Sequence, residues 1–269
     1  MSVHLSWLVW PAIISLPLIL TYNDNYKQVF PQTWYDETEL STNYNTWPKP
    51  LGLTLGILAV IIGQIFTLIY FYLKHYGYLG QIIPVQKEGV IKYDIYEGMI
   101  THLFQPEGFI MLGSYLIGTW MFNIMPNSYY SFSGGINWLH VILQLLIQDF
   151  IQYIMHICEH KVSSYFYRIS HKPHHKFTNP RLFDAFNGSP TDTFIMILIP
   201  LILTAHIVHT NVWSYMTFGS LYANWLTLIH SESIHIWDET LFYKLGFGTA
   251  PDHHVHHKLF VYNYGHLFM

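Results

Sequence analysis

Histidine is the residue type through which this sequence could do chemistry. The 269-residue chain holds 18 histidines, more than its 12 lysines and arginines together. Two triplets share the spacing H-x-x-H-H, of which random placement would give ~0.08 in the whole chain. An H-x-x-x-H pair precedes them, and residues four apart lie on one face of a helix. In chain order these histidines are His156 and His160; His171, His174 and His175; His253, His256 and His257.

The number of candidate ligands indicates two metal ions. Eight histidines exceed the four ligands of one structural zinc site. His230 and His235, in the sequence HSESIH, could complete the shell of the second ion, and the alternative for both is a solvated loop. Imidazole binds iron, zinc, copper and nickel. We expect two iron ions, with zinc as a substitute, because iron can reduce and split oxygen.

Asp149 is a carboxylate inside an otherwise apolar segment. Such a placement costs ~2.5–3.5 kcal/mol on insertion scales and generally indicates function. We expect Asp149 to act outside the ligand shell, as an acceptor that orients a liganding histidine. The alternative is a polar residue hydrogen-bonded at a helix interface. Cys158 is interpreted as packing, and His206 and His209 as structural or interfacial.

The composition predicts a membrane protein. Only 10% of residues are charged and 51% are hydrophobic, whereas soluble domains carry about 25% charged residues. The net charge of −4 gives no reason to expect nucleic acid, and one cysteine excludes an internal disulfide framework.

Apolar runs predict an all-α, integral membrane helical bundle. The run 51–73 is long enough for one full span, which needs ~20 residues. Two pairs of apolar segments are expected to form helical hairpins, 108–125 with 136–155 and 193–209 with 212–229. The shorter run 7–20 is expected to be an interfacial helix.

Charge predicts the orientation. Residues 161–181 are basic and 21–50 mainly acidic, so the positive-inside rule places the former in the cytoplasm. The histidine groups then form a cytoplasmic, histidine-rich helical cap. We divide the chain into an N-terminal membrane region, 1–135, and a domain that contains the histidines, 136–269.

The histidine pattern resembles the fatty acid hydroxylase/sterol desaturase superfamily of membrane diiron enzymes. Within it, YRISHKPHHKF (167–177) and HHVHHKLFVYNYG (253–265) are most similar to sterol C5-desaturases, also called lathosterol oxidases. Members usually continue past NYG with W-D-x-x-x-G, whereas this chain ends at Met269. C-terminal truncation of the domain is therefore an open alternative. The 230–252 loop also departs from the usual one, which puts the substrate in doubt.

The resemblance implies a multi-pass endoplasmic reticulum enzyme of sterol biosynthesis. It would use O2 and electrons from a cytochrome b5-type donor to introduce the C5–C6 double bond of a Δ7-sterol, with its metal site facing the cytoplasm. Two alternatives stay open. One is a hydroxylase of a sterol, fatty acid or sphingoid base, and the other is a non-catalytic metal-binding membrane protein or transporter.

Overall fold

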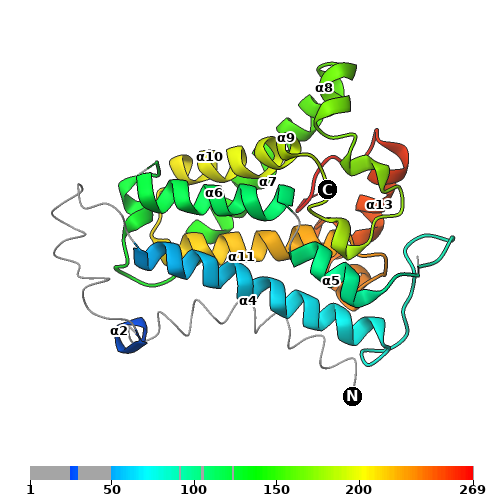
Figure 1. Ribbon diagram of the computed structural model, residues 1–269, viewed down its shortest axis with the longest axis horizontal. Helices are drawn as coiled ribbons and strands as arrows, with labels where there is room; N and C mark the ends of the chain where they lie inside the picture. Colours follow the sequence, from blue (N-terminus) through cyan, green and yellow to red (C-terminus); the bar gives the residue numbers. More distant parts are fainter. Residues whose placement is uncertain (1–24, 30–49, 91, 104–105, 123, 269) are drawn as a thin grey trace.

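The described part of the chain is helical. The computed structural model describes residues 25–29, 50–90, 92–103, 106–122 and 124–268 (Figure 1). Among these residues extended pairing is limited to isolated bridges, Pro84 with Ser233 and Phe247 with Phe268. The all-α prediction is thus confirmed for this part, while the run 7–20 lies outside the described residues.

Each apolar run in the described part forms a helix. Four of the bundle helices are α4 (Pro50–His75), α6 (Pro106–Phe122), α7 (Trp138–Lys161) and α11 (Val212–Ile229). The fifth is a continuous helix made of α9 (Pro190–Thr193), a π-helical turn (Phe194–Leu198) and α10 (Ile199–Ile207). The shorter helices are α2 (Tyr26–Val29), α5 (Ile95–Leu103), α8 (Ser164–Ile169), α12 (Tyr243–Leu245) and α13 (Ala250–Leu259). Single turns occupy Asn127–Tyr130, His174–Lys176, Leu182–Asp184 and Asp238–Phe242.

Side-chain caps fix where the helices that carry the histidines begin. Asn137 accepts a hydrogen bond from the backbone N–H of His140 at the start of α7, and Asn211 does the same for Ser214 in α11. Ser189 caps α9 with Pro190 in its first turn. Each cap satisfies an N–H group that the helix leaves unpaired. The caps therefore set which side chains reach the far end of each helix.

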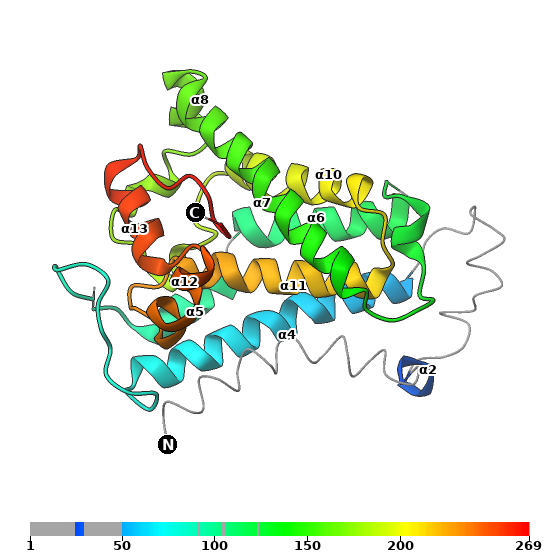
Figure 2. The ribbon, with the colours of Figure 1, turned by 180° about the vertical axis from the view of Figure 1, so that it is seen from behind.

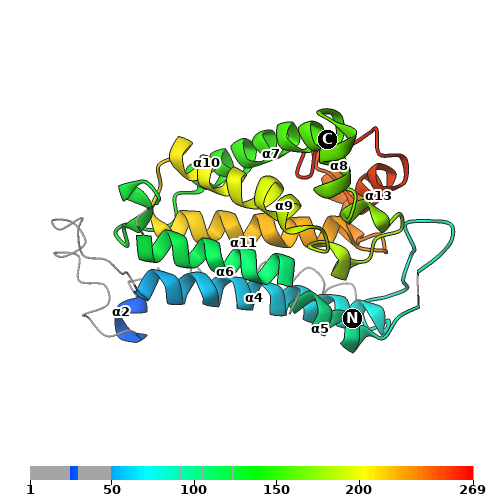
Figure 3. The same ribbon diagram turned by 45° about the horizontal axis from the view of Figure 1, so that its top comes forward.

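Helix α11 lies between α4 and α7, while α6 packs on α4 and α10 on α7 (Figures 1 and 3). The connections from α6 to α7 and from α10 to α11 lie at one end of the bundle. The other end holds α8, α13 and the end of the chain (Figures 1 and 2). The members of each predicted pair are therefore joined at the same end of the bundle, but neither α6 with α7 nor α10 with α11 is among the helix pairs that pack closely together. The histidine-bearing segments gather at the opposite end.

Helix α7 has its polar side inward. Gln144, Gln148 and Gln152 are buried, whereas Leu146 and Phe150 are exposed. This inversion is typical of a helix whose outer face meets lipid. The stretches Trp138–Lys161 and Pro190–Ile207 are long and apolar enough to cross a membrane. With 24 residues, α7 is ~36 Å long, against a hydrocarbon core of ~30 Å. The span at 51–73, the cytoplasmic cap and the domain division stay predictions.

The outward face of α7 can be tested with spin labels. In a Cys158→Ser background, a nitroxide at Phe150→Cys should collide often with O2 and rarely with a water-soluble nickel reagent, because position 150 faces lipid. The matched label at Leu182→Cys, a buried position outside the bundle helices, should respond weakly to both reagents. Equal or greater access of the nickel reagent to position 150 would contradict the lipid-facing assignment. The measurement is power-saturation EPR in vesicles.

Candidate metal centre

The structure gathers histidines from four segments into two adjacent groups at one end of the bundle. Within each group the potential ligand atoms all lie within 4.8 Å of one another. The first group, called group A, is His156, His160, His171, His175 and His256. The second, called group B, is His174, His230, His253 and His257. The rings of His175 and His257 are 4.9 Å apart between centroids, so the groups adjoin.

In group A, Nε2 atoms face one another. The Nε2 atom of His156 lies 2.9 Å from that of His171. His175 has its Nε2 atom 3.1 Å from that of His160 and 3.0 Å from that of His256. Two nitrogens bound at ~2.1 Å to one ion at a right angle would be ~3 Å apart. These separations therefore fit ligands of a shared ion.

Group B repeats the arrangement. The Nε2 atom of His230 lies 2.9 Å from that of His253 and 3.2 Å from that of His174. His257 completes the group with its Nε2 atom 3.1 Å from that of His253. His230 is the C-cap of α11, and His253 and His257 are one turn apart on α13. The group thus joins the end of a bundle helix to the last helix of the chain.

Backbone carbonyls determine which nitrogen of several rings carries the proton. The Nδ1–H of His156 donates to the carbonyl of Tyr264 at 2.8 Å, and that of His256 to the carbonyl of Tyr262 at 2.7 Å. The Nδ1–H of His230 donates to the carbonyl of Leu226 at 2.6 Å. Because a carbonyl only accepts, the Nε2 atom of each neutral ring keeps its lone pair.

Converging lone pairs in a buried space call for a cation. Burial lowers the pKa of His174 to about 4 and that of His256 to about 2, and it lowers the pKa of His253 well below the usual value. These imidazoles are therefore neutral at pH 7 and cannot relieve their repulsion by binding protons. A metal ion in each group would relieve this repulsion, and both donor sets fit one.

Two buried carboxylates stand behind group A. The Nδ1–H of His171 donates to Asp192 at 2.7 Å, and Glu159 lies 3.3 Å from the same nitrogen. A carboxylate in this position fixes the ring and raises its basicity. Gly188 leaves the room that Asp192 needs, because a side chain at 188 would meet that carboxylate. Asp192 also places a negative charge beside the cation site.

Nine of the ten predicted ligands belong to the two groups, and His235 does not. The hydroxyl of Tyr70 lies 2.7 Å from its Nδ1 atom, and the ammonium of Lys74 donates to the same atom at 3.1 Å. Its Nε2 atom lies 3.3 Å from the carbonyl of Leu228. After His230 the loop turns toward α4, which takes His235 away from group B.

Asp149 contacts the backbone of the C-terminal segment. Its carboxylate accepts hydrogen bonds from the N–H groups of His266, Leu267 and Phe268 at 3.3, 2.7 and 3.2 Å. Tyr264, whose carbonyl accepts the hydrogen bond from His156, lies two residues before the first of these bonded N–H groups. No direct hydrogen bond from Asp149 to a histidine ring is found among the described residues. The described part of the chain therefore does not show the predicted hydrogen bond to a liganding histidine, and an indirect influence through the backbone is a hypothesis.

Sequence reasoning missed Glu159, Asp192 and His266. The ring of His266 lies 5.0 Å from that of His156 and 5.3 Å from that of His253, although no spacing pattern includes it. Glu159 directly precedes His160, and Asp192 follows the cap Ser189. Of these three residues, only Glu159 could have been recognised from the sequence, because it is a carboxylate that lies between the two histidines of the H-x-x-x-H pair.

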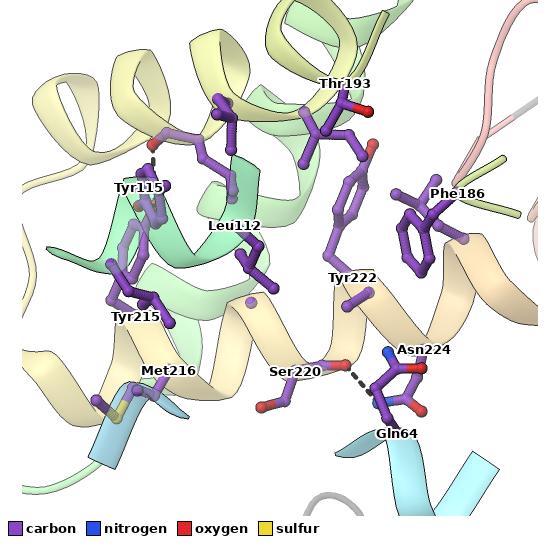
Figure 4. Close-up of a pocket in the computed structure, with 18 of the residues that line it drawn as sticks. Gln64, Leu112, Tyr115, Phe186, Thr193, Tyr215, Met216, Ser220, Tyr222 and Asn224 are labelled. Atoms are coloured by element: carbon purple, nitrogen blue, oxygen red, sulfur yellow. Dashed lines mark hydrogen bonds between the residues drawn. The ribbon is translucent and has the colours of Figure 1, made fainter. Parts of the chain in front are cut away.

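Two cavities lie at the centre and in the adjoining part of the bundle. A cavity of about 40 Å³ is lined by Gln152, His171, His174, His230 and His266, among others. A larger one of about 150 Å³ lies between α4, α6, α10 and α11 (Figure 4). Both are lined by Phe186, Thr193, Ile197 and Leu226. These shared walls place the larger cavity directly behind the metal centre.

Several polar groups in the wall of the larger cavity hydrogen-bond to protein, whereas the hydroxyl of Tyr222 and the Nδ1 atom of His102 have no hydrogen-bond partner among the described residues. His102 and Gln64 are 2.6 Å apart between Nε2 and Oε1. The amide of Asn224 donates to the carbonyl of Ser220 and accepts from Thr67 (Figure 4 shows the first of these bonds). Aliphatic and aromatic side chains form most of the remaining wall. The cavity therefore suits an apolar guest.

Comparison with known proteins identifies relatives. Residues 141–269 match the family model described as fatty acid hydroxylase. The chain is 58% identical over 267 residues to the alternative squalene epoxidase of Phaeodactylum tricornutum, which covers 97% of this chain and 76% of that protein. It is 31% identical over 139 residues to the Delta(7)-sterol 5(6)-desaturase ERG3B of Gibberella zeae, covering 50% of this chain and 40% of that protein. No solved structure matches.

Ligand roles can be measured as bound metal. His175→Ala should lose at least one ion, because His175 faces two other ligands of group A. His235→Gln should retain the wild-type metal content, since both nitrogens of His235 are engaged elsewhere. His206→Ala, at the other end of the bundle, is the control. Full metal retention in His175→Ala, by elemental analysis of purified protein, would refute group A.

The indirect role of Asp149 predicts a graded effect. Asp149→Leu leaves three backbone donors unpaired, at ~1–3 kcal/mol each if they stay buried, so the segment 264–268 should detach and metal binding weaken. Asp149→Asn keeps an acceptor and should be milder. Limited proteolysis of the C-terminal segment and metal content are measured together, with the exposed Glu239→Gln as control. An intact segment in Asp149→Leu would contradict the anchoring role.

Proposed function

This chain belongs to the fatty acid hydroxylase family and is an oxidoreductase, and from this premise we propose that it epoxidises squalene or a closely similar isoprenoid alkene. The observation that carries the proposal is the 58% identity to a squalene epoxidase across 97% of the chain. The apolar cavity behind the metal centre supports it, because a hydrocarbon substrate offers no polar atom to satisfy.

The reaction consumes the alkene, O2, two electrons and two protons, and it yields the epoxide and one water. Both carbon–oxygen bonds of the epoxide are made to one oxygen atom, while the O–O bond breaks and the other oxygen leaves as water. Two iron ions, held by groups A and B, would supply the redox chemistry that reduces O2. Electrons would come from a one-electron donor protein of the cytochrome b5 type.

The chain's own residues would hold the ions, exclude water and position the alkene. Carbonyl-bound imidazoles keep their lone pairs directed inward, so the ions are held without rearrangement of protons. His156, His256 and His257 have no exposed surface, which keeps bulk water from the reacting atoms. Phe186, Ile197 and Leu226, shared by both cavities, would guide the hydrocarbon toward the ions.

Desaturation of a Δ7-sterol is the second candidate. The similarity to ERG3B favours it, and so do the histidine motifs, but that similarity covers half of the chain at 31% identity. The larger cavity does not separate the two candidates, because the unpaired Tyr222 hydroxyl in its wall could hydrogen-bond to a sterol hydroxyl. On the sequence similarity we rank epoxidation first. The endoplasmic reticulum membrane and a cytoplasmic metal site are part of the same proposal.

Labelled oxygen separates the two candidates. Full-length protein in membranes, given squalene, a reductase system and ¹⁸O2, should form an epoxide that contains one ¹⁸O atom per molecule. Desaturation of a Δ7-sterol would leave no label in the lipid. Lipid products are analysed by mass spectrometry, with His175→Ala as the inactive control. Formation of a Δ5,7-sterol together with no labelled epoxide would sink the epoxidase proposal.

A further inference from the structure

A line of polar side chains runs along α7 from the hairpin end of the bundle to the metal centre. Its members recur at every fourth position: His140, Gln144, Gln148, Gln152 and His156. The three glutamines are at most 2% exposed. Four residues advance a helix by ~6 Å, so the line covers most of the thickness of a bilayer. We call these three glutamines the glutamine file.

The glutamine file holds amide atoms without protein partners. Neither the Oε1 nor the Nε2 atom of Gln144 has a hydrogen bond, and the Oε1 atom of Gln152 has none. Gln148 accepts a hydrogen bond from the hydroxyl of Thr204 at 3.0 Å. Buried amides that lack partners destabilise a protein unless water satisfies them. Four amide atoms of the file therefore lack a protein partner, and ordered waters with several polar partners each would satisfy them.

One end of the file lies at the metal centre, and the other lies near the partly buried His140 at the hairpin end of the bundle. Gln152 lines the cavity that His171, His174 and His230 also line. At the other end His140 is only partly buried, and its Nδ1 atom lies 3.2 Å from the hydroxyl of Thr210 in the turn before α11. The file therefore joins the metal centre to the opposite end of the bundle.

The ligands themselves are poor proton donors. The Nδ1–H groups of His156, His230 and His256 are committed to backbone carbonyls, and His156 and His256 have no exposed surface. The proposed reaction nevertheless consumes two protons and releases one water per turnover. A route other than the ligand rings has to carry them.

We propose that the glutamine file holds a chain of water molecules that supplies these protons and takes up the water that is formed. The inference rests on the proposed function for the number of protons, but the presence of water does not depend on it. The glutamines act as positioning residues, because their amides hold the waters and touch neither substrate nor metal. Proton movement along the file passes from water to water, with no change in the glutamines.

The first experiment uses the wild-type chain. An experimental map of the full protein in lipid nanodiscs, at a resolution that shows ordered water, should contain water oxygens within hydrogen-bonding distance of the Gln144 amide and of Gln152 Oε1. A dry file in such a map would overturn the inference, whatever the protein catalyses. Water in the file without epoxide formation would instead count against the proposed function alone.

The second experiment uses Gln144→Met and Gln148→Met, which keep side-chain length and remove the polar atoms. Turnover should fall roughly ten- to a hundredfold, with KM and metal content unchanged, a larger solvent isotope effect in D2O and more hydrogen peroxide per electron consumed. Thr217→Val is the matched control, because this buried hydroxyl donates to a carbonyl of its own helix. Wild-type turnover and isotope effect in both glutamine variants would refute the file as the proton route.

Discussion

Neutral imidazoles whose lone pairs face one another need a cation between them. Burial prevents the rings from charging, and backbone carbonyls hold the Nδ1 protons on the outer side of several rings. Without a metal, Nε2 atoms about 3 Å apart would repel. If groups A and B bind metal as proposed, the folded state of this end of the bundle would be coupled to metal binding, as in other proteins whose ligands come from distant segments.

The helical bundle brings together the histidines that would share the metal ions. Group A takes ligands from α7, from the segment after α8 and from α13, and group B takes them from that segment, the end of α11 and α13. These segments are distant in the chain, so they meet only if the helices are in register at one end. The caps at Asn137 and Asn211 fix where α7 and α11 begin, and Asp149 ties the last described residues to the middle of α7. The contacts that stabilise the bundle are thus the same contacts that position the histidine side chains.

A membrane surrounding explains why α7 is polar inside. In a soluble protein the exposed Phe150 and Leu146 would face the core, and the buried glutamines would face water. Here lipid covers the apolar side, which leaves the interior free to hold amides, carboxylates and imidazoles. In the proposed function, an apolar substrate would approach from the bundle side, while α7 contributes polar groups next to the metal site. The centre therefore has the polar inner face of α7 on one side and the largely apolar cavity of the bundle on the other.

The sequence alone predicted the helical class and the nine histidines that gather in groups A and B, whose role as metal ligands is part of the proposal. It could do so because i,i+4 and H-x-x-H-H spacings are local, and because apolar runs report helices directly. Only the tertiary structure separated His230 from His235, since the path of the loop after α11 depends on contacts with Tyr70 and Lys74. It also decided the roles of Asp192 and His266, which reach the centre through packing between segments far apart in the chain. Local spacing in the sequence indicates which histidines could bind a metal together. The residues that surround these histidines are brought there by long-range contacts, which sequence spacing does not reveal.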